Sequence, residues 1–555
     1  MLSIEQLKKA LESFDWARVK PLLDAAGGQA IDSADIAEAL RRAGDLVIKY
    51  PVAAEQQRNA LLKSLEQYLV AGLPDAKLPP QIEDAVQTIR VAEAGYRKLV
   101  GELSKTDASK LDSTVHVAAS IRRAEEEVNH LTAEYHKQAA QRDGITLQAG
   151  LLDEFGNPTD MDAVLENCIG FVSMTLQMES FRNKWFDADG DIVVPALPEV
   201  TDEAVYQAGS TLVLAVLWRR WQMTEEKARV LGRSLRFLRD DERPKQAPDQ
   251  LKAFIVDEGD DSSDWLHRVA LERVTDKLSQ NLVELKAKVN LGRHQPKFIL
   301  PGGGKALPPH DWVSEDELHA LWALEQYLAY DVVSDNERPA GLRLVEWVRG
   351  YCVLKKLASE AKRDDLLRTK CGWQDYLAKF GMTAATSEVL LARLTFRRSS
   401  RDLFDHPFIK LADGRYRLFA TALRSLNVPL VVLSTLSHLS VQLPRKGKSF
   451  EVTVKEAFEL AGVKAYAFKA KRGGDEFEYD AVVPWGDFLF VIECKNRSLP
   501  FGSPVQMHYF DLAMKGHIKQ VQRLMRGLQE HPDILLSHFP AEVSRFQFRY
   551  EPGAV

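Results

Sequence analysis

Cysteine is scarce in this chain: its 555 residues include four, Cys168, Cys352, Cys371 and Cys494. They lie far apart, and no two of them form a C-x-x-C pair. This spacing argues against a zinc-binding motif and against a disulfide framework, and it fits a reducing compartment. We therefore expect a cytoplasmic protein.

Long apolar runs are also missing. The longest, residues 428–443, is interrupted by Ser and His and is too short to cross a bilayer. The first residues lead into an amphipathic helix and do not resemble a signal peptide. We expect no membrane association.

Two segments partly match known motifs, one for binding nucleotides and one for binding calcium, but each lacks residues that its motif requires. Residues 302–305 read Gly-Gly-Gly-Lys, but Ala306 follows where a phosphate-binding loop needs Ser or Thr at a helix start. Residues 187–191 are rich in Asp, but Ile192 and Pro198 occupy the positions where a calcium loop needs Gly and Glu. We interpret the second segment as a turn. The chain then has no nucleotide-binding motif of its own, and any motor activity would come from a separate polypeptide.

The composition is that of an ordinary globular protein, with 45% hydrophobic and 27% charged residues and a net charge of −6. Helical periodicity dominates the first half of the chain. We predict an α+β multidomain protein with three parts. A large, mostly α-helical region covers residues 1–295, with a subdomain break near 143–160; a mixed α/β module covers 296–440; and an α/β/α domain covers 441–555.

Within the helical region we expect helices near residues 203–223 and 226–239, and a linker or exposed loop at the acidic stretch 241–264. Residues 314–380 are predicted to be helical again. Asp413-Gly414 suits a type I′ hairpin turn. The basic residues around that turn leave two interpretations open, a wing that grips DNA and a structural hairpin, of which we expect the second.

The chemistry is concentrated in residues 477–495. Two apolar-rich strands flank Gly486-Asp487, where a two-residue type II′ turn needs a positive φ at Gly486. Alternation places Glu478, Asp480 and Val482 on one face of the first strand, with Phe477, Tyr479 and Ala481 on the other.

Counting back from the turn puts Asp480 opposite Glu493, with a four-residue turn as the alternative that makes them diagonal neighbours. Two carboxylates so close on an apolar sheet repel each other unless a cation lies between them. Lys495 is one candidate, and Mg²⁺ (or Mn²⁺) is the better one. Paired carboxylates, a metal and a lysine are the parts of a phosphodiester-cleaving site.

This pattern, Asp480 followed by Glu493-Cys494-Lys495, resembles the PD-(D/E)XK nuclease superfamily, whose domains are restriction endonuclease-like. The resemblance covers about the last 110 residues, and Tyr479 stands where the family often has Pro. A preceding helix carrying Glu451 and a following helix, residues 514–529, carrying Gln520 and Arg523 match further parts of the family pattern.

The resemblance implies a metal-dependent nuclease, most readily acting on DNA, with RNA left open. Asp480, Glu493 and the backbone carbonyl of Cys494 would hold the metal, and Lys495 would orient or deprotonate the attacking water and stabilise charge on the phosphate. Glu451 would assist at a second metal, although it also belongs to a charge ladder along its helix. Glu478 is an alternative carboxylate, and Gln520 and Arg523 would be accessory.

The helical region would then target or regulate cutting, or bind a protein partner. By analogy of architecture, this combination suits a prokaryotic antiviral defence system. The alternative is a catalytically inactive nuclease-like domain that binds nucleic acid or acts as a scaffold within a larger complex.

Overall fold

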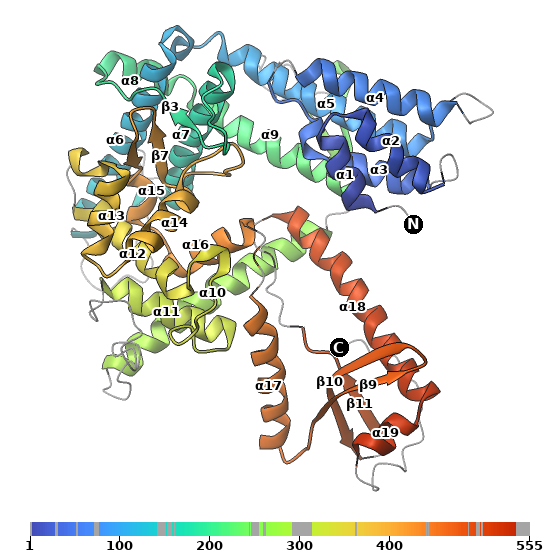
Figure 1. Cartoon of the computed structure of the whole chain (residues 1–555). Helices are drawn as coiled ribbons and strands as arrows, with labels where there is room; N and C mark the ends of the chain where they lie inside the picture. The colour runs from blue at the N-terminus through green and yellow to red at the C-terminus, as the bar shows by residue number, and fades with distance from the viewer. Residues whose placement is uncertain are drawn as a thin grey trace. The chain divides into compact units, whose positions relative to one another are not determined.

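The computed structural model describes residues 3–27, 32–50, 54–71, 77–140, 151–152, 158–159, 161–242, 245, 255–258, 262–290, 313–360, 363–439, 441, 443–486, 488–495, 500 and 503–539. The chain is mostly helical, with small sheets, which confirms a mixed α+β protein (Figure 1). No helix among the described residues is long and apolar enough to span a membrane.

The chain divides into two compact units that interleave along the sequence. One contains residues 1–261, 354–378 and 383–426; the other contains 262–353, 379–382 and 427–555. This division differs from the three consecutive ranges expected from the sequence, because most of residues 354–426 pack with the N-terminal helices. Each unit is described by itself below.

The first unit is built on helices, most of which share one hydrophobic core. Several begin at a side-chain cap: Ser3 and Asp15 accept hydrogen bonds from the backbone at the starts of the first two helices. The helices are α1 (Ile4–Glu12), α2 (Trp16–Ala25), α3 (Ser33–Arg42), α4 (Ala54–Val70), α5 (Pro80–Leu103), α6 (Ser113–Ala140), α7 (Met161–Asn183), α8 (Asp202–Gly209), α9 (Leu212–Leu231), α13 (Lys370–Ala378), α14 (Ala384–Leu394) and α15 (Thr421–Arg424).

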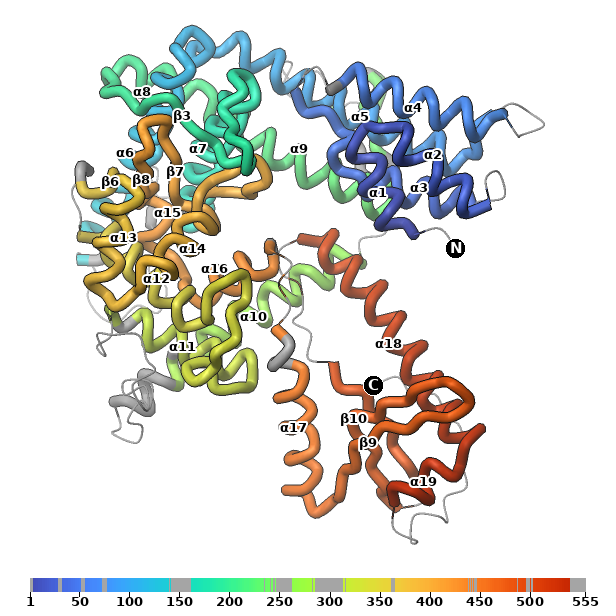
Figure 2. Tube along the Cα trace, viewed as in Figure 1, coloured from blue at the N-terminus to red at the C-terminus, as the bar shows by residue number. Residues whose placement is uncertain are grey.

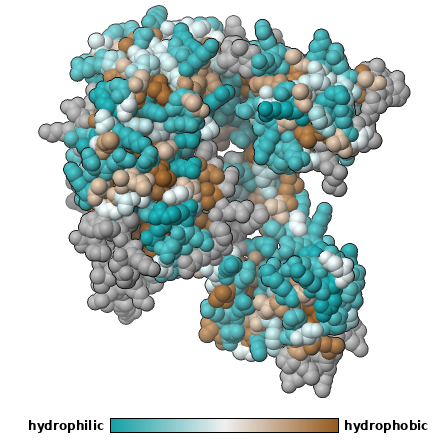
Figure 3. Space-filling view, viewed as in Figure 1, coloured by the Kyte–Doolittle hydropathy of each residue, from teal (hydrophilic) through white to brown (hydrophobic). Residues whose placement is uncertain are grey.

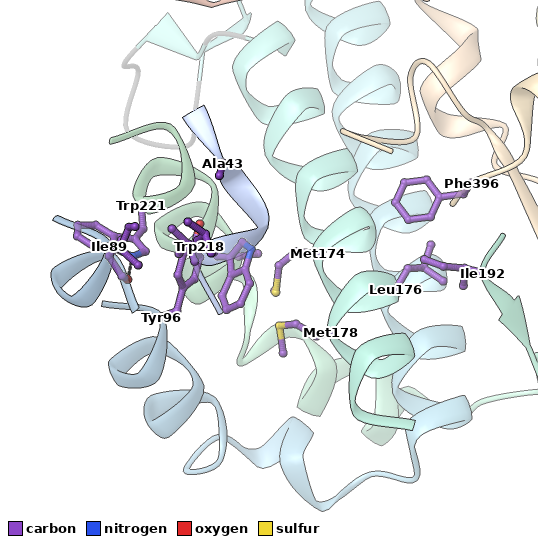
Figure 4. Packing of buried hydrophobic residues seen from close by; sticks show 14 of the residues in the cluster. Ala43, Ile89, Tyr96, Met174, Leu176, Met178, Ile192, Trp218, Trp221 and Phe396 are labelled. Carbon is purple, nitrogen blue, oxygen red and sulfur yellow. Dashed lines mark hydrogen bonds between the residues drawn. The ribbon is translucent and has the colours of Figure 1, made fainter. Parts of the chain in front are cut away.

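Aromatic rings fill the place where α5 and α9 cross. Tyr96 and Trp218 lie 4.8 Å apart between ring centroids, and Figure 4 shows them beside Trp221. The indole of Trp221 donates a hydrogen bond to the Ala92 carbonyl (3.0 Å) and lies directly over Gly95, where a Cβ atom would fall 2.2 Å from the ring. A larger residue at position 95 would therefore push the two helices apart.

Two sequence predictions in this region are wrong. The helix expected over 226–239 is the end of α9, which stops at Gly232 with φ +66°. The chain then forms β4 (Ser234–Phe237), which pairs antiparallel with β5 (Ile255–Glu258). Part of the acidic stretch predicted to be a linker is thus a strand, and α10 (Ser262–Asn290) begins within it.

A four-stranded sheet in the first unit runs in the order β3 (Val193–Val194), β7 (Phe408–Leu411), β8 (Arg415–Leu418) and β6 (Leu367–Thr369). The expected hairpin is β7–β8, but its loop is not type I′. Lys410 pairs with Tyr416, Gly414 has φ +81° and Asp413 does not have a positive φ, so Ala412, Asp413 and Gly414 form a three-residue loop. A further pair, β1 (Leu151–Leu152) and β2 (Pro158–Thr159), is antiparallel.

The basic residues of this hairpin are engaged inside the unit. Arg417 is buried and pairs with Glu125 of α6 (2.6 Å), and Lys410 pairs with Asp187 (2.6 Å). Asp187 also accepts hydrogen bonds from the backbone of Asp189 and Asp191, so residues 187–191 form a turn. These contacts tie the hairpin to the fold, whereas contact with DNA stays a hypothesis.

The second unit contains α10, α11 (Glu315–Leu328), most of α12 (Leu344–Glu360) and α16 (Val428–His438). The expected continuous helical stretch from 314 to 380 is interrupted between α11 and α12 and again by β6. Trp322 and Trp347 are buried, as expected, while Trp312 and the glycine-rich residues 302–305 lie outside the described residues.

The last part of the second unit is an antiparallel three-stranded sheet in the order β11 (Phe488–Ile492), β10 (Asp475–Trp485), β9 (Tyr466–Arg472). Helix α17 (Pro444–Leu460) precedes the sheet, and α18 (Pro504–Glu530) and α19 (Asp533–His538) follow it (Figure 2). One face is covered by α18 and α19 through a core of Phe477, Tyr479, Val482, Leu524, Leu528, Ile534, Leu535 and Phe539. The predicted order of helix, three strands and helix is therefore present.

Candidate active site

The β10–β11 hairpin has the predicted register. Trp485 pairs with Phe488 and Ala481 with Ile492. Gly486 has φ +61°, the conformation that the turn requires, while Asp487 lies outside the described residues. Because Trp485 pairs with Phe488, the two-residue turn, rather than the four-residue alternative, is present. β11 ends at Ile492, and extending its register by one residue brings Glu493 opposite Asp480.

The strand alternation has one error of prediction. The pairing of β10 with β9 shifts by one residue between Tyr479 and Val482, which is a β-bulge. Because of this extra residue, Val482 packs in the same core as Phe477 and Tyr479, not on the opposite face. The phase change also separates two carboxylates, since Glu478 is exposed whereas Asp480 is 8% exposed.

Asp480 is held by the strand opposite. Its Oδ2 accepts a hydrogen bond from the backbone N–H of Cys494 (2.9 Å), and the Lys495 ammonium lies 3.9 Å from the same oxygen. The Asp480 carboxylate thus accepts a hydrogen bond from the Cys494 N–H that a backbone carbonyl would accept if the β10–β11 pairing continued. Asp480 is fixed before any ligand arrives.

Glu493 is held on one oxygen only. Its Oε1 receives both the Lys495 ammonium and the side-chain amide of Gln520 on α18 (2.7 Å). Its Oε2 is buried and has no hydrogen-bond partner among the described residues. The whole Glu493 side chain is only 4% exposed. A buried carboxylate oxygen without a partner is costly and calls for a cation or an ordered water.

The electrostatics of the pair follow from this burial. Burial raises the pKa of the Glu493 carboxyl and repulsion from Asp480 adds to the shift, while the hydrogen bond with Lys495 opposes it. Burial alone would lower the pKa of Lys495, but its hydrogen bond and attraction to Glu493 outweigh burial and raise the pKa. Lys495 is therefore protonated, as an ammonium, in this arrangement.

Glu451 lies near these groups, on α17 as predicted. Burial raises the pKa of its carboxyl, and the charges of Asp480 and Glu478 raise the pKa further. The neighbouring thiol of Cys494 has a pKa raised to about 11, chiefly by burial and then by Asp480, so it is not a nucleophile at neutral pH.

Two predicted accessory residues make their contacts outside the carboxylate pair, although the charge of Glu478 still raises the pKa of Glu451 and of Glu493. Glu478 pairs with Lys469 of β9 (2.7 Å) on an exposed surface. Arg523 donates to the Glu476 carbonyl (3.3 Å) and stacks over Phe477, one turn of α18 beyond Gln520. Of the two α18 residues, Gln520 alone contacts a site carboxylate. The role of the Cys494 N–H as a donor to Asp480 was not predicted, because residue type carries no signal for a backbone contact.

The donor set fits a hard divalent cation. Asp480 and Glu493 each keep one carboxylate oxygen that is not used in the contacts above, and Mg²⁺ binds through one or two carboxylates and otherwise keeps its waters. Lys495 is the one cation within ion-pair distance of either carboxylate among the described residues. No cluster of three or more His, Cys, Asp or Glu side chains suited to a metal occurs in the described part of the chain.

Comparison of this chain with protein-family models, with curated proteins and with solved structures finds no match. Membership of the PD-(D/E)XK superfamily therefore stays a prediction that rests on the residues and geometry above.

Proposed function

We propose that residues 441–555 form a Mg²⁺- or Mn²⁺-dependent nuclease domain that hydrolyses phosphodiester bonds in DNA. The observation that carries the proposal is the buried, partnerless Oε2 of Glu493 beside Asp480, with one ammonium to offset two carboxylates in the described site. Burying two carboxylates beside a single ammonium is energetically costly. A divalent ion bound between the carboxylates would offset that cost.

Each residue has a separate task in this proposal. Asp480 and Glu493, with the backbone carbonyl of Cys494, would hold the ion, which supplies Lewis-acid polarisation of phosphate and a lowered pKa for bound water. Gln520 orients Glu493 by occupying Oε1, and the Cys494 N–H orients Asp480. Glu451 supplies further negative charge from α17.

Lys495 is assigned one of the two roles expected from the sequence. The contact with Glu493 raises the pKa of Lys495, so Lys495 is an ammonium and cannot accept a proton. General-base action by Lys495 is therefore disfavoured. A fixed positive charge next to the scissile phosphate would stabilise the negative charge that develops in the transition state.

The second candidate is a nuclease-like domain that binds nucleic acid or a partner without cutting. It is favoured because the described residues place no third His, Cys, Asp or Glu side chain with the two carboxylates in a metal-binding cluster. In either case we propose, as the sequence led us to expect, that the helical region targets or regulates the C-terminal domain.

The test is incubation of the purified full chain with supercoiled, linear and single-stranded DNA in Mg²⁺, Mn²⁺ or EDTA. We expect cutting that requires the divalent ion and is absent in Asp480→Asn. Divalent binding without cutting of any substrate would favour the second candidate, and cutting that persists in Asp480→Asn would place the active site elsewhere.

A further inference from the structure

Helix α18 carries positive charge that is not matched by negative charge over most of its length. Between Asp511 and Glu530 it contains no Asp or Glu, although acids outnumber bases in the whole chain, 79 to 73. The same segment holds four Lys and Arg residues, which we call the cationic stripe: Lys515, Lys519, Arg523 and Arg526. The surface around α18 in Figure 3 is largely hydrophilic. A solvated helix face commonly carries charges of both signs, whereas bases clustered along one helix are typical of a surface that binds a polyanion.

The four side chains lie on one face of the helix. Successive members are three or four residues apart, which places them within about 80° around the helix axis and along about 16.5 Å of its length. Lys519 and Arg526 are exposed and form no ion pair or hydrogen bond among the described residues. Lys515 pairs with Asp511 (2.8 Å), whereas Arg523 donates to a backbone carbonyl. Within the described chain, no acid lies within ion-pair distance of three of the four bases.

The cationic stripe adjoins the proposed active site. Gln520, which donates a hydrogen bond to Glu493, is the residue directly after Lys519. Arg523 lies about 60° around the helix from Gln520, and it contacts the backbone of β10 (3.3 Å). Lys519 and Arg526 lie about 40° and 60° farther around the helix in the same direction. The stripe thus begins where α18 meets the sheet and continues onto the exposed side of the helix.

We propose that the cationic stripe binds the phosphate backbone of the DNA that enters the active site. This rests on the proposed nuclease function and adds to it a surface that holds the substrate beside the cut. Duplex DNA presents one negative charge per about 1.7 Å of its axis, so a row of cations about 16.5 Å long can meet several phosphates. Contacts with phosphates position a protein on DNA and carry no sequence information. We therefore expect binding that depends on salt and not on sequence.

The test uses the salt dependence of binding. Fluorescence anisotropy of the full chain with a labelled duplex of about 25 base pairs is recorded in EDTA, between about 50 and 200 mM NaCl. Each phosphate contact contributes about 0.9 to the slope of log affinity against log salt concentration. Lys519→Gln/Arg526→Gln should therefore reduce the magnitude of the slope by about 1.8. Lys519→Arg/Arg526→Lys, which keeps both charges, should retain the parental slope.

Arg273→Gln/Lys277→Gln is the matched control, because it removes two exposed bases from α10, where Glu272 and Asp276 are interleaved with them. It should bind the duplex with the parental slope. Equal slopes for the parent and the glutamine variant of the stripe would overturn the proposal, as would a parent that does not bind DNA. An equal fall in the stripe variant and the control would also overturn it, since binding would then follow net charge alone.

RNA of the same length distinguishes the two nucleic acids. A reduced slope with RNA, together with an unchanged slope with DNA, would assign the stripe to RNA and overturn the DNA assignment.

Failure of the nuclease proposal gives a different result. DNA binding that depends on the cationic stripe, together with no cutting in Mg²⁺ or Mn²⁺, would reject the nuclease and support the stripe. Divalent-dependent cutting, with equal slopes for the parent and the stripe variant, would do the reverse.

Discussion

Two pairs of carboxylates beside β-hairpins show how differently similar sequence patterns are used. In the first unit, Asp187 and Asp191 lie next to the β7–β8 hairpin and face Lys410 and Arg397, so two acids meet two bases. In the second, Asp480 and Glu493 face Lys495 alone among the described residues. Two bases offset the first pair, although Oδ1 of Asp191, like Oε2 of Glu493, is buried without a hydrogen bond among the described residues, whereas the second pair retains a negative charge. The balance of charge, not the presence of paired acids, separates a structural cluster from a candidate metal site.

The largest expected difference concerns the two lysines. Lys495→Ala keeps both carboxylates but removes the fixed ammonium, so cleavage should fall by about 100-fold or more, the scale for losing one preorganised charge stabiliser. Lys410→Ala should cut at the parental rate. Initial rates on supercoiled DNA in Mg²⁺ measure both. A Lys495→Ala protein that cuts like its parent would refute the assigned role.

Divalent ions should distinguish the two acid pairs by thermal stability. A ligand that binds the folded state stabilises it by about 2.7 kcal/mol at 100 times its Kd. Mn²⁺ should therefore raise the unfolding temperature of the parent and of Asp187→Asn. Asp480→Asn and Glu493→Gln should lose this response, and their metal-free stability should not fall greatly, since a repulsion is removed.

Isothermal titration calorimetry provides the check on that result. If Asp187→Asn abolished divalent binding and Asp480→Asn left it intact, the contrast between the two clusters would be reversed.

Two glycines test whether the regions can be perturbed separately. A Cβ at Gly95 would meet Trp221 in the first unit, and one at Gly527 would lie 2.5 Å from Phe477 of β10. Overpacking of this kind costs about 1–3 kcal/mol. Gly527→Ala should weaken divalent binding, because it displaces the strand that carries Asp480, and Gly95→Ala should not. Urea unfolding followed by divalent titration measures the two effects, and equal loss of divalent binding in both variants would contradict the prediction.

The smallest effect is a pH dependence in the cluster of Asp187 and Asp191. Burial raises the pKa of Asp187, but the hydrogen bond from Lys410 and backbone donors outweigh burial, so the pKa is lowered. A carboxyl with a lowered pKa stabilises the fold above its unfolded pKa, and this stabilisation disappears as the pH falls through the folded pKa. Asp187→Asn should therefore cost about 1 kcal/mol or less at neutral pH, and nothing in strong acid. Urea midpoints at several pH values measure this, and a pH-independent difference would exclude the ion pair as its source.

The register of the β10–β11 hairpin could be predicted because local signals determine it. Gly486 allows the tight turn, and the alternation on both sides then leaves one pairing that buries the apolar residues. The same reasoning placed Glu451 and Gln520 on flanking helices, although only the resemblance suggested that Gln520 would reach the site.

What could not be predicted depends on contacts distant in sequence. The bulge near Asp480 arises from pairing with β9, and nothing in residues 479–482 themselves marks it. The charge balance at Asp187 depends on Lys410 and Arg397, more than 200 positions away in the chain. The exchange of segments between the two compact units likewise follows from packing that periodicity does not encode.

The contact between Asp480 and the Cys494 N–H also makes one amide proton a reporter of the site. This donor is buried against a carboxylate, so its exchange with solvent deuterium requires the hairpin end to open. A bound metal ion that draws electron density from Asp480 would weaken that hydrogen bond. The same ion would also hold the end of the hairpin closed. The exchange rate at Cys494, compared with that of Ile492 two residues earlier, would therefore separate tightening of the whole strand from a change at the carboxylate alone.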